Sequence, residues 1–119
     1  MRYVDGFVLP IAARNLAAYR RIALKAGKIW REHGALAYLE CAGDDLAIKG
    51  VASFPRSIKA RPRETVVFAW IVFKSRAHRD RVNALVMKDP RTAAMMDPSQ
   101  NIVDPKRMLY GGFKAIVDL

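Results

Sequence analysis

One short run of apolar residues constrains the fold more than any other part of the sequence. Residues 64–74 are rich in β-branched and aromatic side chains and too few to form a good helix, so they predict a β-strand. Alternate side chains of a strand point to opposite faces. Both sets are apolar here: Val67, Ala69, Ile71 and Phe73 on one face, and Val66, Phe68, Trp70 and Val72 on the other. Both faces of this strand must therefore be covered.

Two helices and a short third one are predicted around this strand. Residues 14–33 form an amphipathic helix, because apolar residues recur on one arc and basic residues on the opposite arc, and Gly34 ends it. Ser75 caps a second helix at 76–88, and four of its basic residues are expected on the outer side: Arg76, Arg79, Arg81 and Lys88. Asp89, followed by a proline, opens the short third helix.

Three further strands are expected at 3–9, 35–42 and 107–117. Pro10 is expected to end the first of them. Two consecutive glycines in the last strand, Gly111 and Gly112, indicate a bulge or a close approach of backbone. The connection 43–63 is long for a compact domain, and it is expected to hold a short helical turn that begins at Pro55.

The order strand, helix, strand, strand, helix, strand is that of the α+β ferredoxin-like βαββαβ fold. We expect one domain over residues 1–119, with a four-stranded antiparallel sheet whose central pair, strands 3–9 and 64–74, runs parallel. Two helices cover only one face of such a sheet, and the other face is too apolar to be left in water. A homodimer whose two sheets face each other in a barrel-like arrangement is therefore expected.

Composition favours a folded chain in a reducing compartment. Of the 119 residues, 52% are hydrophobic and 27% charged, which is typical of globular proteins. The one cysteine, Cys41, cannot form an internal disulfide. No apolar run approaches the roughly 18 residues of a membrane span, and Asp5 interrupts any signal-peptide pattern. These features predict a cytoplasmic protein with no membrane partner.

The chain is strongly basic, with 21 Lys and Arg against 11 Asp and Glu and a formal net charge of +10. One interpretation of this excess of basic residues is a polyanionic partner such as RNA. Its expected contacts are the basic helix faces and four residues of the connection 49–63: Arg56, Lys59, Arg61 and Arg63. The alternative is a set of solvated helix faces that keep the protein in solution. We favour this alternative, because net charge governs association and not fold.

Seven stretches of the chain carry a family likeness: Tyr3–Phe7, Tyr19–Arg20, Trp30–Ala35, Glu64–Phe68, Lys74–Asp80, Met87–Arg91 and Arg107–Phe113. In these the sequence resembles the YbaA-like family, the domain of unknown function 1428, within the dimeric α/β-barrel superfamily. The resemblance covers nearly the whole chain and implies the dimeric barrel fold. That superfamily includes cofactor-free monooxygenases, haem-degrading enzymes and lactone isomerases, so the resemblance also implies a cavity with a few polar side chains.

The first functional hypothesis is a cavity in which a small apolar or aromatic molecule is bound or transformed by cofactor-free chemistry. Asp5 and Glu40 are candidates for the general base, and His33 is the candidate acid–base partner. Four further residues are expected to contact the ligand: Tyr3, Tyr38, Trp70 and Tyr110. The cavity is expected beside Trp70 and His33. Neither a cofactor nor a metal is expected, because no metal-ligand spacing, phosphate-binding loop or nucleophile elbow occurs.

Two simpler interpretations stay open beside the cavity and polyanion hypotheses. His33 lies in the last turn of the predicted helix, where an imidazole can cap the negative helix end. The protein can also be a dimeric module with no chemistry of its own.

Overall fold

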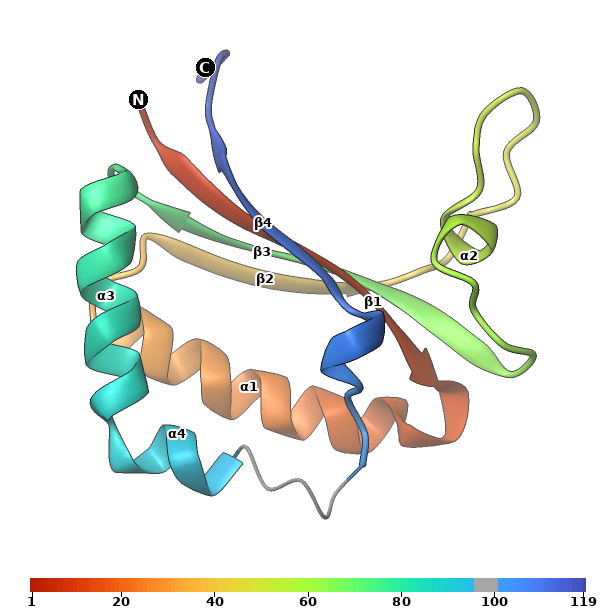
Figure 1. Ribbon diagram of the computed structural model, residues 1–119, viewed down its shortest axis with the longest axis horizontal. Helices are drawn as coiled ribbons and strands as arrows, with labels where there is room; N and C mark the ends of the chain where they lie inside the picture. Colours follow the sequence, from red (N-terminus) through yellow and green to blue (C-terminus); the bar gives the residue numbers. More distant parts are fainter. Residues whose placement is uncertain (96–100) are drawn as a thin grey trace.

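The computed structural model describes residues 1–95 and 101–119, which contain four strands in one sheet (Figure 1). The strands are β1 (Tyr3–Ala12), β2 (Ala37–Ala42), β3 (Glu64–Phe73) and β4 (Leu109–Lys114). The α-helices are α1 (Leu16–Glu32), α2 (Phe54–Ser57), α3 (Arg76–Lys88) and α4 (Pro90–Met95). Short 3-10 turns, η1 (Ala13–Asn15) and η3 (Pro105–Arg107), precede α1 and β4. This order confirms the predicted α+β arrangement.

The strands follow the order β2-β3-β1-β4, and every neighbouring pair is antiparallel. The prediction that the central pair, β1 and β3, runs parallel is therefore wrong. The crossover through α1 returns the chain so that β2 runs in the same direction as β1. The next connection reverses it, and β3 enters between β1 and β2 in the opposite direction to both. The strands that run in the same direction, β1 with β2 and β3 with β4, are thus not neighbours in the sheet.

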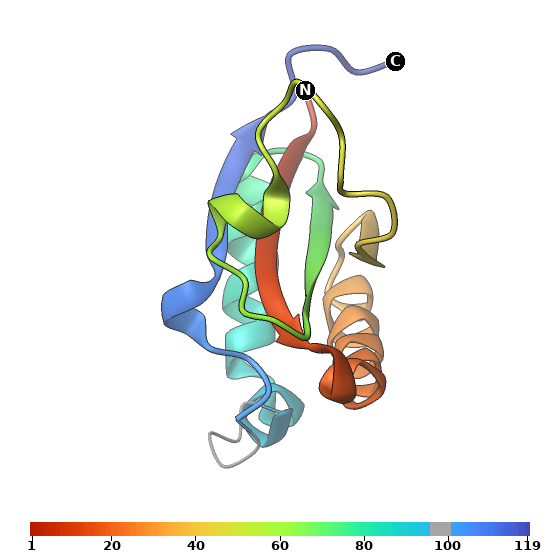
Figure 2. The same cartoon turned by 90° about the vertical axis from the view of Figure 1, so that its right-hand side faces the viewer.

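One face of the sheet carries the helices and the other is open. Figure 1 shows α1, α3 and α4 on one side of the sheet, while the 43–63 connection with α2 rises on the other side. Figure 2 shows that α1 runs along the β2 edge. The helix-side residues of β3, which are Val67, Ala69, Ile71 and Phe73, are all buried. On the open face Phe68 remains 42% exposed, and Trp70 and Val72 are half-buried.

The core lies between the sheet and the helices in two groups of buried side chains. The larger group joins β1, β3, α1 and α3 through Tyr3, Ile29, Ala35, Ile71, Phe73, Val82 and Val86. The smaller group lies near the start of α1 and comprises Leu9, Ile11 and Val67. Among the described residues, no helix is both long and apolar enough to cross a membrane.

β1 extends beyond the predicted boundary, because Pro10 does not end it. Pro10 is paired with Val66 of β3, while β4 pairs with β1 only as far as Val8. Beyond Val8 the β4 side of β1 is a sheet edge, where a residue without an N–H group is tolerated.

The two glycines of β4 sit in an uninterrupted register, with Gly111 opposite Gly6 and Gly112 opposite Asp5, so they form no bulge. A side chain, and not the predicted backbone, approaches Gly112 closely. A Cβ atom on Gly112 would lie 2.2 Å from the hydroxyl oxygen of Tyr3. Gly112 therefore makes room for a buried tyrosine on the neighbouring strand.

Candidate functional site

The polar residues predicted for a cavity lie in three separate places on the helix-covered side. Tyr3, Asp5 and Tyr110 come together on β1 and β4, Tyr38 and Glu40 lie between β2 and α1, and His33 follows the end of α1. The structure thus brings together three of the seven predicted residues in one group and two in another.

Trp70 belongs to the opposite face of the sheet. It is paired with Gly6 and Leu39, and with Val4 and Phe113 it lines a shallow hollow of about 920 Å³ on the open face. The expected cavity beside Trp70 and His33 is therefore not formed. Strand alternation settles this, because Trp70 has the opposite parity to Ile71, which packs under the helices.

A buried carboxylate forms the first site. Asp5 is 1% exposed, and its Oδ2 accepts a hydrogen bond of 3.2 Å from the hydroxyl of Tyr110. Arg79 of α3 donates to the hydroxyl oxygens of Tyr110 (3.3 Å) and Tyr3 (3.1 Å). The guanidinium carbon also lies 5.0 Å from the centre of the Tyr3 ring. We refer to these four residues, Tyr3, Asp5, Arg79 and Tyr110, as the Asp5 cluster.

Two atoms of this cluster lack hydrogen bonds. Asp5 Oδ1 and Arg79 Nε are buried without a hydrogen-bond partner, and they lie 3.7 Å apart. That distance permits electrostatic attraction but exceeds a hydrogen bond. Both groups also have other polar neighbours, since Arg79 Nε lies 3.4 Å from Asp80 Oδ1 and a hydrogen bond from the Asn83 side chain helps to lower the pKa of Asp5.

Burial and neighbouring charges shift the pKa of Asp5, and likewise that of Arg79, in opposite directions. Burial raises the pKa of Asp5 above its usual range, although the Arg79 charge and the Tyr110 hydrogen bond oppose this effect. Burial lowers the pKa of Arg79, but the hydrogen bond to Tyr3 and the Asp5 charge outweigh it, so the net shift is upward. Burial and the nearby Asp5 charge raise the pKa of Tyr110. A proton-accepting carboxylate thus lies next to a fixed cation and a neutral phenol.

Local structure explains how these side chains meet. Tyr3 and Asp5 alternate along β1 and so share its helix-covered face. Ser75 caps α3 by accepting a hydrogen bond from the His78 amide, and this starts the helix one turn before Arg79. Arg79 then reaches across to β1.

The sequence did not predict Arg79 as a member of the Asp5 cluster, because the helix pattern places it on the outer side. A signal was present, since a carboxylate on an apolar strand face requires a positive partner or hydrogen bonds. Arg79 also precedes the buried Val82 by three residues, a spacing that puts both on adjoining parts of one helix face.

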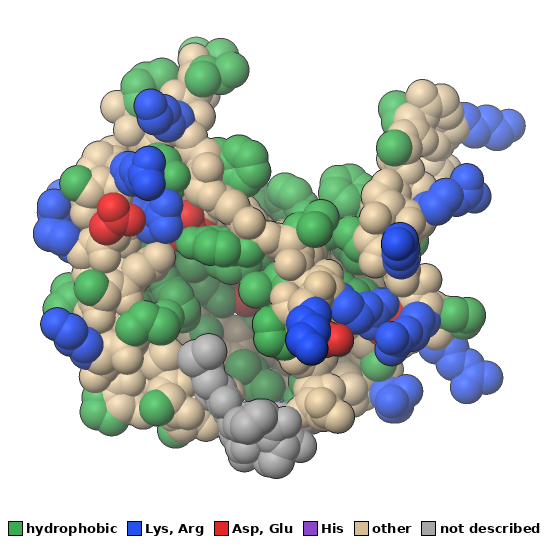
Figure 3. Space-filling view, viewed as in Figure 1, with side chains coloured by type: hydrophobic (Ala, Val, Ile, Leu, Met, Phe, Trp, Pro, Cys, Tyr) green, Lys and Arg blue, Asp and Glu red, His purple; other side chains and the backbone are tan. Residues whose placement is uncertain are grey.

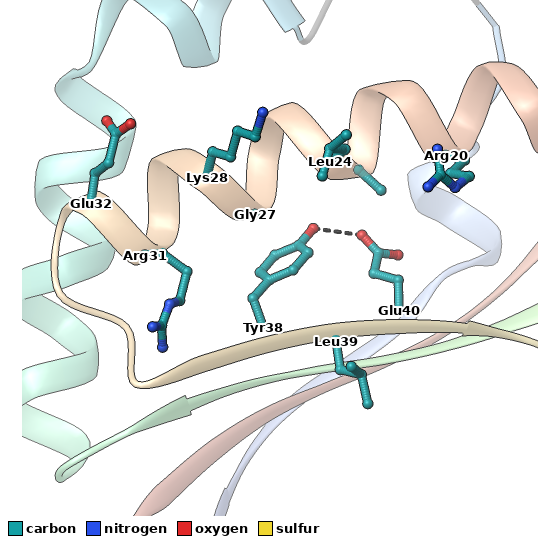
Figure 4. Close-up of a pocket in the computed structure, with 10 residues that line it drawn as sticks. Arg20, Leu24, Gly27, Lys28, Arg31, Glu32, Tyr38, Leu39 and Glu40 are labelled. Atoms are coloured by element: carbon teal, nitrogen blue, oxygen red, sulfur yellow. Dashed lines mark hydrogen bonds between the residues drawn. The ribbon is translucent and has the colours of Figure 1, made fainter.

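Two tyrosines and a carboxylate form the second site. Glu40 of β2 accepts hydrogen bonds from the hydroxyl of Tyr19, on α1, through Oε1 and from that of Tyr38 (2.5 Å) through Oε2. The pKa values of both tyrosines are raised, chiefly by burial and also by the Glu40 carboxylate. Figure 4 shows Tyr38 and Glu40 pointing from β2 toward α1, across a groove of about 530 Å³.

His33 belongs to a network at the end of α1. Its Nε2 lies 2.9 Å from Asp89 Oδ2, and Arg91 bonds both Asp89 (2.8 Å) and Glu32 (2.7 Å). Hydrogen bonds from Arg91 and His33 lower the pKa of Asp89. These contacts tie α1 to α4, and the His33 imidazole bonds the Asp89 carboxylate and not the last carbonyls of α1.

The basic residues of the 43–63 connection lie on the surface. Arg56, Lys59, Arg61 and Arg63 are all exposed. The segment is anchored at two points, where the Ala13 amide donates to Arg63 O (2.8 Å) and Arg107 donates to Lys59 O (3.3 Å). Figure 3 shows Lys and Arg side chains gathered at this end of the molecule. Within the described residues, no three His, Cys, Asp or Glu side chains are grouped closely enough to hold a metal ion.

Comparisons with known proteins place these sites in a family context. The model of the family described as "Protein of unknown function (DUF1428)" matches residues 2–103. The chain is 42% identical over 118 residues to "Uncharacterized protein YbaA" of Escherichia coli K12, and equally to that of Shigella flexneri, covering 99% of both chains in each case. An uncharacterised NIPSNAP domain protein from Burkholderia xenovorans has a similar fold, with a TM-score of 0.57, 11% identity, and coverage of 95% of this chain and 93% of that chain.

Proposed function

The chain belongs to the DUF1428 family, and we propose that it binds a small apolar or aromatic carbonyl compound at the Asp5 cluster and moves a proton on it without a cofactor. The observation that carries this proposal is the buried Asp5 carboxylate with an unpartnered oxygen. Burying a carboxylate costs several kcal/mol unless it is fully paired, so a purely structural role would favour complete pairing.

Tyr110 connects the buried carboxylate to the surface. Its side chain is 50% exposed, while its hydroxyl donates to Asp5 and accepts from Arg79. A substrate proton can pass to the Tyr110 oxygen as the phenolic proton passes to Asp5. Asp5 is then the net base, and the raised pKa of its carboxyl group makes it a stronger proton acceptor than an ordinary carboxylate.

Arg79 supplies the electrostatic part of the step. Abstraction of a proton next to a carbonyl group leaves an enolate, and a fixed cation near a low-dielectric site stabilises that charge. Return of the proton from Asp5, through Tyr110, to another carbon completes an isomerisation. The reaction is redox-neutral, and the carboxylate and the phenol both recover their starting protonation states.

Proton exchange in D₂O tests this function directly. α-Aryl ketones and unsaturated lactones serve as probes, and ¹H NMR follows loss of the proton next to the carbonyl group. The intact protein is expected to accelerate exchange of at least one probe, and Asp5→Asn to slow it by about 100-fold or more. The matched control is Asp45→Asn, which changes an exposed carboxylate in the 43–63 connection.

Tyr110→Phe keeps the test valid if Asp5→Asn fails to fold, because Tyr110 is half exposed and retains its ring. It is expected to lose exchange activity while keeping the circular dichroism spectrum of the parent. If no probe exchanges faster with the parent protein than with Tyr110→Phe, the proton-transfer function is excluded for this class of compound.

We further propose that the functional unit is a homodimer with the two open faces packed together. Large apolar side chains are exposed on this face, including Leu39, Phe68, Leu109 and Phe113. Figure 3 shows hydrophobic side chains on the floor between the two raised ends of the molecule. A monomer rarely exposes such a continuous apolar area.

A second candidate function is binding of RNA or another polyanion at the basic end of the molecule. It is favoured by the exposed Arg14, Arg61, Arg63 and Lys106, which come from segments joined by the Ala13–Arg63 and Arg107–Lys59 hydrogen bonds. Fluorescence anisotropy with single-stranded RNA should show affinity that falls steeply between about 50 and 200 mM salt. Arg61→Gln should weaken binding, whereas Arg81→Gln on α3 should not. Salt-independent or undetectable binding would reject this function.

A further inference from the structure

The groove between α1 and β2 has features of a second ligand site, separate from the Asp5 cluster. Its volume of about 530 Å³ lies within the range of small-molecule pockets. One wall is the exposed side of α1, with Leu24, Lys28 and Arg31, and the floor includes Gly27 and the Tyr38 ring. Figure 4 shows Arg31 on one side of Tyr38 and Glu40 on the other.

The positive charge of this groove is not used to neutralise its own carboxylates. Glu40 takes its hydrogen bonds from two tyrosines, and Glu32 pairs with Arg91 at 2.7 Å. Within the part of the chain that the structure describes, Arg20, Lys28 and Arg31 form no ion pair. These three cations therefore remain available to an external anion.

Arg31 is already oriented for such a role. One of its terminal nitrogens, Nη1, donates to the carbonyl oxygens of Ala35 (3.4 Å) and Leu36. A guanidinium group carries five N–H donors in a rigid plane. Two contacts through one nitrogen fix that plane and leave the remaining donors for a carboxylate, so little side-chain freedom is lost on binding.

The apolar part of the groove lies next to this cation. Leu24 is 50% exposed although it stands among basic residues, and the Tyr38 ring packs so closely on Gly27 that a Cβ there would lie 2.7 Å from it. The absence of a side chain at Gly27 lets the Tyr38 ring pack directly on α1, and both residues line the groove. The segment of α1 from Leu24 to Arg31 is about two helical turns, or roughly 11 Å, long. A planar hydrophobic ligand can make apolar contacts along this length.

We propose that this groove binds a small aromatic carboxylate, with its ring on Leu24 and Tyr38 and its carboxylate on Arg31. The charge selects an anion and the apolar wall selects a ring. A flexible polyanion would use the whole basic side of α1 equally, whereas this site distinguishes Arg31 from cations that lie outside the groove.

Calorimetric titration with 2-naphthoate tests the proposal, with 2-naphthalenemethanol as its neutral counterpart. The intact protein should bind the carboxylate about tenfold more tightly than the alcohol. Arg31→Gln and Leu24→Gln should each weaken naphthoate binding by about tenfold. Arg21→Gln is the matched control, because Arg21 is exposed on the same helix but does not line the groove. Its affinity should match that of the parent.

Three results would overturn this assignment. The first is no binding of 2-naphthoate at millimolar concentration. The second is an equal loss in Arg21→Gln and Arg31→Gln, which would indicate attraction by the whole basic face. The third is equal binding of the alcohol, which would place the ligand on an apolar surface such as the open sheet face. Leu24→Gln keeps the test valid if Arg31→Gln disturbs the turn after α1, since Leu24 is half exposed.

Discussion

At the scale of single residues, the structure leaves no room for a side chain at Gly112, whereas it does at the neighbouring Gly111. A methyl group on Gly112 would meet the hydroxyl oxygen and two ring carbons of Tyr3, at 2.2 to 2.8 Å. Tyr3 is buried and bonded to Arg79, so it cannot swing aside cheaply. Gly112→Ala is expected to lower the free energy of unfolding by about 1–3 kcal/mol in urea titrations.

Gly111→Ala provides the control, because the nearest atom to its added methyl group is 3.6 Å away, an ordinary contact. Both substitutions are in β4, so they share any general effect of removing a glycine from a strand. Equal stabilities for the two variants would show that Tyr3 can move and that the close approach is not a constraint.

The residues of the candidate site could be predicted only where a local pattern revealed them. Asp5 stands out because strand alternation places a carboxylate among apolar residues, and the structure buries it. Its link to Arg79 spans 74 positions of sequence and depends on how α3 crosses the sheet. A helical pattern gives the side of a helix but not its tilt, so Arg79 was assigned to the solvent side.

At the scale of secondary structure, periodicity and capping located the elements well. The strand at β3, the Ser75-capped helix and the short turn at Pro55 all occur as predicted. Strand direction could not be obtained in that way, because it follows from the path of the connections. The end of β1 was also missed, since the tolerance for Pro10 depends on how far β4 extends along its other side.

One ion pair, Glu64–Arg107, joins the start of β3 to η3 and makes this contact dependent on pH. Glu64 accepts two hydrogen bonds of 2.7 Å from Arg107, and these bonds are the main reason that the pKa of Glu64 falls to about 2 from its ordinary value of 4.5. A carboxylate with a lowered native pKa stabilises the fold above its ordinary pKa, and this contribution disappears as the pH falls toward the native value.

Glu64→Gln is therefore expected to unfold more easily than the parent at pH 7, by about 1 kcal/mol. The difference should shrink as the pH falls from 4.5 to about 2. Thermal unfolding at several pH values measures it. Glu32→Gln, which removes an exposed ion pair with Arg91, should change stability little at any pH. A Glu64→Gln deficit that is constant with pH would contradict the ion-pair explanation.

At the scale of the whole molecule, the apolar open face of the sheet is the main support for the proposed dimer. The helices cover one face of β3. On the second apolar face, inferred from the sequence, the described residues bury Val66 but leave Phe68 42% exposed (Figure 1). The 43–63 connection and the C-terminal end rise on either side of this face. The apolar side chains on both faces of β3 predict a central strand. They also support the proposed dimer, because a second copy offers an identical apolar surface.

A charge placed on this face should separate the two copies. Phe113 is 61% exposed there, so Phe113→Glu is expected to leave the chain folded while replacing an apolar contact by a carboxylate. Light scattering at micromolar concentration should give the parent twice the chain mass of 13.4 kDa and the variant the single-chain mass. Leu85→Glu, at a 49% exposed position of α3 on the other side of the sheet, should remain a dimer. A monomeric parent would reject the dimer outright, and a dimeric Phe113→Glu would move the interface away from the open face.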